Sequence, residues 1–323
     1  AGYANLILAG GVEAMSHAPV LLNHDMVTWL GKWQRARTAV ARLKTLAGLK
    51  PAYLKPVIGL LCGLTDPIVG LSMGQTAEIV AHRFDIDRDE MDEFALTSHQ
   101  RLAQAQDEGN LDEIEVIYDS RGNAYETDTG LRRDSSMEKL ARLKPVFDRP
   151  YGKVTAANSA QITDGAAWLI LASEQAVREH ELPVLGRIVD SQWAALDPAE
   201  MGLGPVHAMA PMLAGHGLDS GDVDYWEINE AFAAQVLGCL NAWQDEPYCQ
   251  GALGLEKPFT PIERSRLNVD GGGVSIGHPV GASGARIVLH LLKVLQRTNT
   301  KRGVASLCIG GGQGGAMLVE SGG

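Results

Sequence analysis

Two observations predict that this chain folds as a layered α/β protein. From residue 182 onward, strand-like apolar runs alternate with segments of helical periodicity, and such alternating elements pack as helices on a sheet. The composition, with 45% hydrophobic and 21% charged residues, is ordinary for a globular protein. The 323 residues are long enough for roughly two domains.

The second half of the chain is expected to start after the break Glu181-Leu-Pro183. Its expected strands are 185–190, 225–228, 304–308 and 316–320, and its expected helices are 205–215, 229–243 and 282–296. Glycine is frequent in the last third, where it marks tight turns between these elements.

The first half is expected to hold two buried strands. One runs from residue 4 to 9 into a Gly10-Gly11 turn, and the other, at 166–172, is followed by a helix at 174–180. Because the chain starts with Ala1 and reads as a strand almost at once, we expect it to begin inside a domain.

Two helices between these strands have clear start signals. Ser72 with Gln75, and Asp87 with Glu90, have the spacing of capping boxes. The first helix is expected to reach residue 82, and the second to end at Gly109. A strand at 114–118 and a polar loop without periodicity, reaching about residue 143, are expected to follow.

Residues 20–71 differ from the rest because they are basic and amphipathic. No acid occurs between Asp25 and Asp66, and apolar residues such as Trp29 and Trp33 recur at helical spacing. The bases of this segment are Lys32, Arg35, Arg37, Arg42, Lys44, Lys50 and Lys55. One interpretation is an element that docks on a membrane surface or a partner. The other is a helical hairpin packed on its own domain with a solvated basic face.

The overall charge and the cysteines narrow the class of protein. A formal charge of −11 argues against nucleic acid as a partner. The four cysteines show no CxxC spacing and no disulfide density, which favours a reducing, cytoplasmic location. The sequence has no apolar run near the roughly 20 residues of a membrane-spanning helix, and we expect no signal peptide.

His278 is the first candidate for chemistry. Pro279 restricts its backbone, and Gly277 and Gly281 let backbone approach a ligand closely. An imidazole held in this way suits general-base work or a hydrogen bond to an acyl oxyanion. The alternative is a buried structural histidine. The glycine spacing fits neither a dinucleotide fingerprint nor a P-loop.

Cys308 and Asn229 follow predicted strands in the same half. Cys308 precedes the glycines 310–312, whose free N–H groups are expected to lower the pKa of the thiol. The alternative for Cys308 is a small buried hydrophobe. Asn229 is either the cap of the following helix or a side chain aimed into a site. For Cys62, Cys239 and Cys249 a structural role is preferred.

Several motifs together resemble the thiolase family over essentially the whole chain. They are Gly10-Gly-Val-Glu-Ala-Met-Ser, Met73-Gly-Gln-Thr-Ala-Glu, Val154-Thr-Ala-Ala-Asn158-Ser159 with Asp164-Gly-Ala-Ala, Gly202-Leu-Gly-Pro205, Asn229-Glu-Ala-Phe-Ala, Gly277-His278-Pro279-Val-Gly-Ala-Ser-Gly and Cys308-Ile-Gly-Gly-Gly. The insert at 20–71 looks like the loop domain of thiolases that form the β-subunit of fatty-acid oxidation complexes.

The resemblance implies an α-β-α-β-α fold of two similar halves, with a helical loop domain inserted in the first. Residues 1–19 and 145–181 would belong to an incomplete first half, 20–144 to the loop domain and 182–323 to an intact second half. Because strands of the first half would be missing, we expect exposed apolar surface and open strand edges there.

The resemblance also implies reversible thiolytic cleavage of 3-ketoacyl-CoA, or the reverse Claisen condensation, in fatty-acid β-oxidation. His278 would activate a nucleophilic cysteine and bind the thioester oxygen together with a water on Asn229. Cys308 would be the second cysteine, and the N–H of Gly310 would serve the other oxyanion hole. The pantetheine and acyl contacts would be Met73, Ala156, Ser159 and Phe232.

No metal and no cofactor is implied, and coenzyme A is a substrate. The expected partners are CoA and its acyl and 3-ketoacyl esters. Further expected partners are other copies of the chain, and a hydratase/dehydrogenase subunit or a membrane surface contacted through the basic segment 29–55. The insert favours substrates of medium or long chain length.

The sequence departs from the family pattern in one serious respect. Thiolases carry the acylated cysteine in a Cys-Ser/Gly-Ser-Gly segment before the Gly-Gly-x-Glu-x-Met-Ser turn, and none of the four cysteines here has that context. We therefore expect a chain that lacks part of its N-terminal domain and does not form an acyl-enzyme alone. A smaller departure is Ala160, where many thiolases have serine.

Two other classes remain to be weighed against a thiolase. The first is a non-catalytic thiolase-like protein that binds CoA esters or lipids. The second is a ketoacyl or hydroxymethylglutaryl-type synthase on the same fold, which lacks a second cysteine, so Cys308 speaks against it.

Overall fold

The centre of the molecule is a four-stranded mixed sheet with the strand order β7-β10-β9-β8. The computed structural model describes residues 4–322. The strands are β7 (Gly186–Ala195), β8 (Tyr225–Ile228), β9 (Arg302–Ile309) and β10 (Gln313–Ser321). Strands β8 and β9 are parallel, and the other two pairings are antiparallel. All four strands were expected from the sequence, although β7 is longer than the predicted 185–190.

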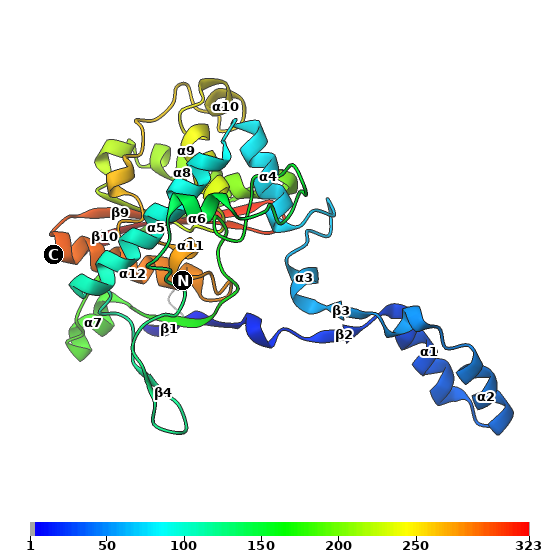
Figure 1. Cartoon of the computed structure of the whole chain (residues 1–323). Coiled ribbons are helices and arrows are strands. Elements are labelled where there is room, and N and C mark those ends of the chain that lie inside the picture. Colours follow the sequence, from blue (N-terminus) through cyan, green and yellow to red (C-terminus); the bar gives the residue numbers. More distant parts are fainter. Residues whose placement is uncertain (1–3, 323) are drawn as a thin grey trace.

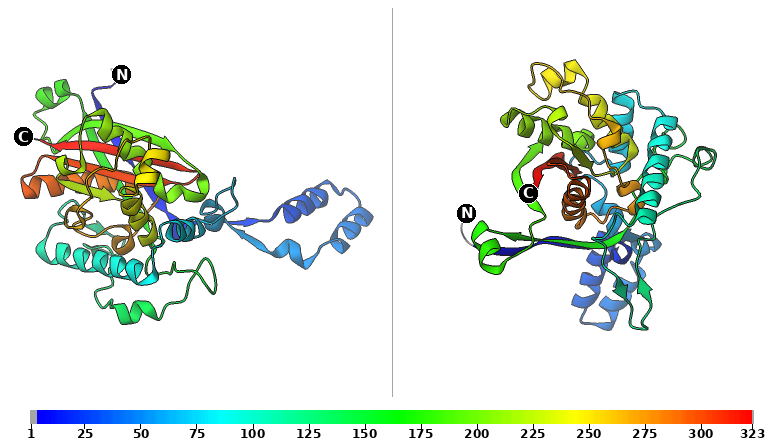
Figure 2. Two further views of the ribbon diagram at one scale, coloured as in Figure 1. Left: turned by 90° about the horizontal axis from the view of Figure 1, so that it is seen from above. Right: turned by 90° about the vertical axis from the view of Figure 1, so that its left-hand side faces the viewer.

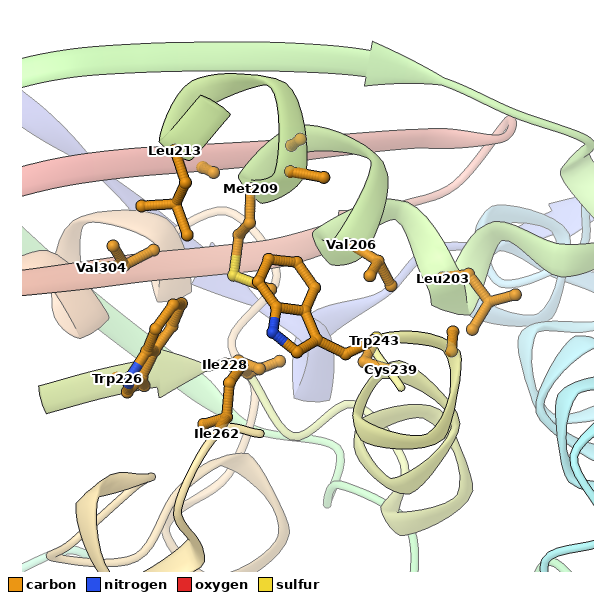
Figure 3. Packing of buried hydrophobic residues seen from close by; sticks show 14 of the residues in the cluster. Leu203, Val206, Met209, Leu213, Trp226, Ile228, Cys239, Trp243, Ile262 and Val304 are labelled. Atoms are coloured by element: carbon orange, nitrogen blue, oxygen red, sulfur yellow. The ribbon is translucent and has the colours of Figure 1, made fainter. Parts of the chain in front are cut away.

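Helices cover both faces of this sheet (Figure 1). Helix α8 (Gly204–Gly215) packs on one face, and α12 (Ser283–Thr298) packs on the other. Figure 3 shows the larger core, in which Trp226 of β8 and Trp243 meet edge to face with their ring centroids 6.2 Å apart. The sheet is thus a rigid base for whatever its strand ends carry.

A two-stranded ribbon forms a further layer on the outer side of α12. In it β1 (Leu6–Ala14) pairs antiparallel with β6 (Asp164–Ala172). The expected turn at Gly10-Gly11 is wrong, because both glycines lie inside β1. A side chain on Gly11 would meet the carbonyl oxygen of Gly281, so glycine is needed here for close packing and not for a bend.

The expectation that β1 and β6 are buried strands is also wrong. Leu8 is 63% exposed, and Val12 and Ile170 are each 67% exposed. The sheet has only these two strands among the residues described, so no neighbour covers their outer face. The expected exposed apolar surface and open strand edges in this half are therefore confirmed.

Helices of the first half reach over the second half. Helix α4 (Met73–Arg83) and helix α5 (Arg88–Glu108) begin at the two predicted capping boxes. Gly109 ends α5 in the left-handed conformation, with φ of 71°. Both helices pack on α9 (Ala233–Ala242), and α5 also contacts α11 (Gly273–Ile276).

The remaining elements are short. They are α7 (Glu174–His180), the hairpin strands β4 (Ile117–Tyr118) and β5 (Ala124–Tyr125), α6 (Met137–Ala141), α10 (Glu246–Gly251), and the 3-10 helices η1 (Met15–His17), η2 (Pro51–Leu54), η3 (Pro198–Leu203), η4 (Ser220–Asp222) and η5 (Arg264–Arg266). Helix α7 was predicted. The strand expected at 114–118 is shorter, and the expected structureless loop contains β5 and α6, which the sequence periodicity did not reveal.

The basic segment forms a helical hairpin that projects away from the body of the molecule (Figures 1 and 2). Helices α1 (His24–Arg35) and α2 (Ala39–Ala47) stand on a stalk made by β2 (Val20–Leu22) and β3 (Pro56–Ile58), which continues into α3 (Gly59–Gly63). The hairpin is confirmed, but the expectation that it packs on its own domain is wrong. Among the described residues, no helix has the length and apolar character needed to cross a membrane.

Candidate active site

His278 lies in the loop between α11 and α12, and glycines let this loop sit against the ribbon. Gly277 has φ of 108°, and a side chain there would strike Thr163. A side chain on Gly165 would come within 2.8 Å of the ring of Pro279. The ribbon that is exposed on its outer face therefore supports the histidine loop on its inner face.

The hydrogen bonds of His278 define its tautomer. Its Nδ1 lies 2.6 Å from Oγ of Ser283, and that hydroxyl donates its only proton to the carbonyl of Pro279 at 3.0 Å. Because the serine oxygen can then only accept, Nδ1 of His278 carries the proton and Nε2 keeps its lone pair. His278 therefore offers a basic Nε2.

Asn229 faces that basic nitrogen. It follows β8, and its Nδ2 lies 3.3 Å from Nε2 of His278. Its Oδ1 lies 3.5 Å from a guanidinium nitrogen of Arg286. Because a guanidinium can only donate, this contact turns the amide nitrogen toward the histidine and agrees with the tautomer.

Asn229 is therefore a side chain aimed into a site, and not a helix cap. The helix expected to start at Asn229 starts instead at Ala233, with Phe232 in the N-cap position. The helix-cap interpretation is therefore wrong, and the amide of Asn229 faces His278 instead.

Burial keeps the His278 imidazole neutral. It lowers the pKa of His278 to about 4, and the positive charge of Arg286 acts in the same direction. The lone pair on Nε2 is thus available throughout the neutral pH range.

Cys308 lies near the end of β9 in an apolar environment. It is 6% exposed and packs in a cluster with Met201 and Ala231, against which Met73 and Phe232 also pack. Burial raises the pKa of Cys308 to about 12. The expectation of a lowered pKa is wrong, because the apolar side chains around the thiol disfavour its charged form.

The glycine turn between β9 and β10 brings Gly310 close to Met73. Gly311 and Gly312 have φ of 83° and 74°, a conformation that favours glycine. A side chain on Gly310 would lie 3.8 Å from the sulfur of Met73. The structure therefore gathers Met73, Phe232, Cys308 and Gly310 at one end of the sheet.

Ser159 and Ala156 belong to the segment that runs beside Phe232. Ser159 forms an isolated β-bridge with Phe232, and its hydroxyl donates to the carbonyl of Thr155 at 2.6 Å. Ala156 lies exposed in the turn that this hydrogen bond closes. Ser159 thus reaches the Cys308 group through Phe232.

The two groups of candidates meet where β8 and β9 end. The N–H of Asn229 donates to the carbonyl of Ser306 at 2.9 Å, and Ser306 precedes Cys308 by two residues. Ala231, which packs on Cys308, follows Asn229 by two residues. Parallel strands with adjacent ends therefore place the imidazole group and the thiol group side by side.

Sequence reasoning missed the residues that hold these groups in place. Glu230 accepts hydrogen bonds from Ser98 at 2.6 Å, Asn268 at 2.9 Å and the N–H of Val274 at 3.2 Å. Burial raises the pKa of this carboxyl, and its hydrogen bonds oppose the shift. The sequence signal that could have found Glu230 is its position inside the Asn229-Glu-Ala-Phe-Ala motif that follows β8.

Ser283 was part of a quoted motif without a role of its own, and Arg286 lay two residues beyond that motif. The signal for Ser283 was its position five residues after His278, at the first turn of α12. Arg286 could not be found in this way, because only the packed structure shows that α12 directs it toward Asn229.

These groups define a class of chemistry. Acyl transfer through thioesters uses a thiol, a neutral imidazole as base and N–H donors for the oxyanion. The site holds a buried thiol, a neutral imidazole beside an oriented amide, and a glycine turn with backbone N–H groups. The fold and the site together therefore define an α/β protein of the acyl-transferring class.

Comparisons with known proteins identify the family within that class. The family described as "Thiolase, N-terminal domain" matches residues 1–175, and "Thiolase, C-terminal domain" matches residues 182–321. The chain belongs to the thiolase family, and the layered fold expected from the resemblance is confirmed.

Named relatives agree with this assignment. A 3-ketoacyl-CoA thiolase of Yersinia enterocolitica is 36% identical over 323 residues, which are 99% of this chain and 73% of the relative. The mitochondrial trifunctional enzyme subunit beta of Bos taurus is 35% identical over 322 residues, 99% of this chain and 67% of the relative. The crystal structure of human mitochondrial 3-ketoacyl-CoA thiolase in complex with CoA is similar with a TM-score of 0.81 at 36% identity, covering 100% of this chain and 72% of that one.

Proposed function

We propose that this chain carries the base, the oxyanion donors and the second thiol of a 3-ketoacyl-CoA thiolase that acts in fatty-acid β-oxidation. The reaction is the CoA-dependent cleavage of a 3-ketoacyl-CoA, or its reversal as a Claisen condensation. The observation that carries the proposal is the Asn229–His278 contact of 3.3 Å beside the buried thiol of Cys308. The family membership and the named relatives support it.

His278 would act first as a base and then as a donor. Its neutral imidazole takes a proton from a thiol on Nε2, and the resulting N–H then faces the thioester oxygen. The amide nitrogen of Asn229 lies beside the same position and adds a second donor, directly or through a water. Ser283 keeps the other ring nitrogen protonated, so the roles of the two nitrogens do not exchange.

Cys308 would move the proton on the α-carbon. Its raised pKa means that the thiol is protonated at neutral pH. In the cleavage direction this is the useful form, because the departing acetyl-CoA carbanion needs a proton. In the condensation direction the same sulfur would take that proton back.

The acyl-carrying nucleophile is not among the four cysteines of the sequence. Burial raises the pKa of Cys239 and of Cys249, which makes both poor nucleophiles. Cys62 lies exposed on α3 and, unlike the acylated cysteine of thiolases, is not in a Cys-Ser/Gly-Ser-Gly segment. We therefore propose that the 323-residue chain does not form an acyl-enzyme by itself.

Proton exchange at the acetyl methyl group of acetyl-CoA tests the proposal without needing an acyl-enzyme. We expect the chain to catalyse exchange in D2O at pH 9, followed by proton NMR, and to bind CoA in calorimetry. His278→Gln should remove an oxyanion donor and slow exchange by about 100-fold while leaving CoA affinity nearly unchanged. Gln175→Ala, on the exposed α7, is the matched control.

The outcomes separate the competing functions. CoA binding without exchange would replace the thiolase proposal by a non-catalytic protein that binds CoA esters. If the chain neither binds CoA nor catalyses exchange, both the thiolase proposal and the CoA-ester-binding alternative are contradicted. If the His278→Gln variant catalyses exchange at the wild-type rate, His278 has no role in this reaction.

The partners follow from the projecting hairpin and from the relatives. We propose that α1 and α2 dock on an anionic membrane surface or on a hydratase/dehydrogenase subunit. Five of the seven bases of the basic segment lie between residues 24 and 47, where Val27, Val40 and Leu43 are exposed. One similar protein is named as a subunit of a trifunctional enzyme, which supports a partner subunit. Assembly with further copies and a cytoplasmic location stay predictions.

A further inference from the structure

A short loop of the first half closes over the glycine turn that follows Cys308. The loop runs from residue 64 to 73, between α3 and α4. Backbone hydrogen bonds close it on itself: Met73 donates to Leu64 at 2.9 Å, and Asp66 donates to Leu71 at 2.8 Å. Thr65 and Ser72 also form a β-bridge. The loop is therefore a rigid element and not a free linker.

Asp66 joins this loop to the glycine turn. One carboxylate oxygen accepts the N–H groups of Ile68 at 2.8 Å and Val69 at 3.1 Å, which holds the loop together. The other oxygen accepts the N–H of Gly311 at 3.1 Å, across 245 positions of the chain. Asp66 is 2% exposed, and no ion pair is formed by it among residues 4–322. Three backbone N–H groups thus stabilise a buried carboxylate.

The Gly311 contact controls a peptide that would otherwise be free to rotate. Gly311 has φ of 83°, and its neighbours Gly310 and Gly312 have no side chains to restrict the turn. With its N–H held by Asp66, the preceding carbonyl of Gly310 points the other way, toward Nε2 of Gln313 at 3.3 Å. Both faces of the Gly310–Gly311 peptide are therefore anchored.

The same loop contacts the turn a second time through Met73. A side chain on Gly310 would lie 3.8 Å from the Met73 sulfur, and Met73 packs on the cluster of Cys308. Loop 64–73 thus contacts the turn at two places. Asp66 accepts a hydrogen bond from Gly311, and Met73 packs on the apolar cluster of Cys308.

We infer that Asp66 is a positioning residue that sets the glycine turn and, through it, the direction of the Gly310 N–H and the place of the Cys308 thiol. Asp66 touches no reacting atom and acts only through the turn. The catalytic meaning of the inference rests on the proposed function, whereas the hydrogen bond to Gly311 and its effect on Cys308 do not.

Asp66→Asn is the sharpest variant because it changes almost no volume. The amide oxygen can still accept from Ile68 and Val69, but the amide nitrogen then faces the Gly311 N–H and cannot accept it. Asp119→Asn is the matched control, since Asp119 also accepts two N–H groups of its own turn, from Arg121 at 2.8 Å and Asn123 at 2.9 Å, far from the site in sequence.

The first readout is the alkylation rate of Cys308 by iodoacetamide, followed by peptide mass spectrometry in a Cys62→Ser background. Removing the anchor at Gly311 lets the turn open, which gives the reagent better access to the Cys308 thiol. We expect alkylation to become about tenfold faster in Asp66→Asn, in line with the loss of one charged hydrogen bond. Asp119→Asn should alkylate at the wild-type rate.

The second readout separates positioning from binding. We expect Asp66→Asn to slow acetyl-CoA exchange by about 100-fold, because a displaced thiol meets the α-carbon in the wrong geometry. Its affinity for CoA should stay near the wild-type value. If exchange is absent in the wild type while alkylation changes as expected, the proposed function fails and the positioning role stands.

Other outcomes overturn the inference. Unchanged Cys308 alkylation in Asp66→Asn would show that the turn does not depend on the carboxylate. Equal losses of CoA affinity and exchange, with a lower melting temperature, would assign Asp66 a structural role only. If the variant does not fold, amide hydrogen exchange of the wild-type chain tests the inference instead. A Gly311 amide that exchanges as fast as the amides of an open turn would contradict a stable hydrogen bond to Asp66.

Discussion

The amide nitrogen of Asn229 lies 3.3 Å from Nε2 of His278, although 49 positions separate the two residues. Arg286 directs the amide from one side, and Ser283 holds the opposite nitrogen of the imidazole. Two independent sets of hydrogen bonds therefore agree on which nitrogen of His278 is basic.

The first prediction concerns the titration of His278. In chain labelled with 15N-histidine, His278 should remain the Nδ1–H tautomer down to about pH 5 and titrate with a pKa of about 4. Because the folded pKa lies below the usual 6.5, stability from this residue is present above pH 6.5 and is lost as the pH falls toward 4. The spectrum of His278→Gln assigns the signal.

Arg286→Met should raise the pKa of His278, because the lost positive charge no longer opposes protonation. Lys293→Met is the control on the same helix, since Lys293 pairs with Asp112 and not with Asn229. A His278 signal that titrates near 6.5 in the wild type would contradict the burial of the imidazole.

The second prediction concerns the protonation of Cys308. Because its pKa is raised to about 12, alkylation of Cys308 should accelerate steadily from pH 7 to pH 10 without a plateau. The measurement uses the Cys62→Ser variant, which lacks the exposed thiol. A plateau near pH 7 would mean that the thiol is activated in the free protein.

The third prediction concerns acyl transfer. After incubation with acetyl-CoA, intact mass spectrometry of the Cys62→Ser chain should show no acetyl adduct, because burial raises the pKa of each remaining cysteine. A stoichiometric adduct that hydroxylamine removes, together with turnover, would refute the proposal that this chain lacks the nucleophile.

The fourth prediction concerns a buried ion cluster between α12 and the loop at 110–113. Nδ1 of His290 lies 2.6 Å from Glu113, and its Nε2 lies 3.2 Å from Asp270. Burial alone would lower the pKa of His290, but the two carboxylates outweigh it and raise the pKa to about 10. His290 therefore stabilises the fold fully below pH 6.5, and this stability is lost as the pH rises toward 10.

His290→Gln should lower the free energy of unfolding by about 3 kcal/mol at pH 6, because it leaves the buried Glu113 carboxylate without a cation, whereas Asp270 keeps its ion pair with Arg297. The difference from wild type in urea denaturation should shrink at pH 10. Lys293→Met, which removes a more exposed ion pair, should cost under about 1 kcal/mol. A pH-independent difference would contradict the charged state of His290.

The fifth prediction concerns the projecting hairpin. Replacing residues 20–58 by a short Gly-Ser linker should leave CoA affinity unchanged and abolish sedimentation with vesicles of anionic lipid, with neutral vesicles as the control. Reversing the charge of Arg37 and Lys44 should weaken binding in a salt-dependent way. If the intact chain does not bind anionic vesicles, the membrane proposal is contradicted, and a hydratase/dehydrogenase subunit remains as the proposed partner of α1 and α2.

Local signals in the sequence were sufficient for the helix starts. Ser72 and Asp87 begin helices because each side chain caps backbone N–H groups three residues away, and Gly109 ends one because it adopts a left-handed conformation. Such interactions span a few residues, so a pattern predicts them. The motifs around His278 and Cys308 were likewise sufficient to indicate the family.

Packing decided what these signals could not. Gly10 and Gly11 read as a turn, yet they lie in a strand because β6 and the loop at Gly281 approach them closely. The pKa of Cys308 is raised and not lowered, because apolar side chains from α4, η3 and the β8–α9 segment surround it.

By itself, the sequence determined the four strands of the central sheet, the capped starts of α4 and α5, and the residue types that thioester chemistry needs. Only the tertiary structure decided that Asn229 faces His278, that Arg286 orients it, and that Asp66 holds Gly311 across 245 positions. Contacts of this kind depend on how distant segments pack, and no local pattern of side chains specifies the distance or direction at which they meet.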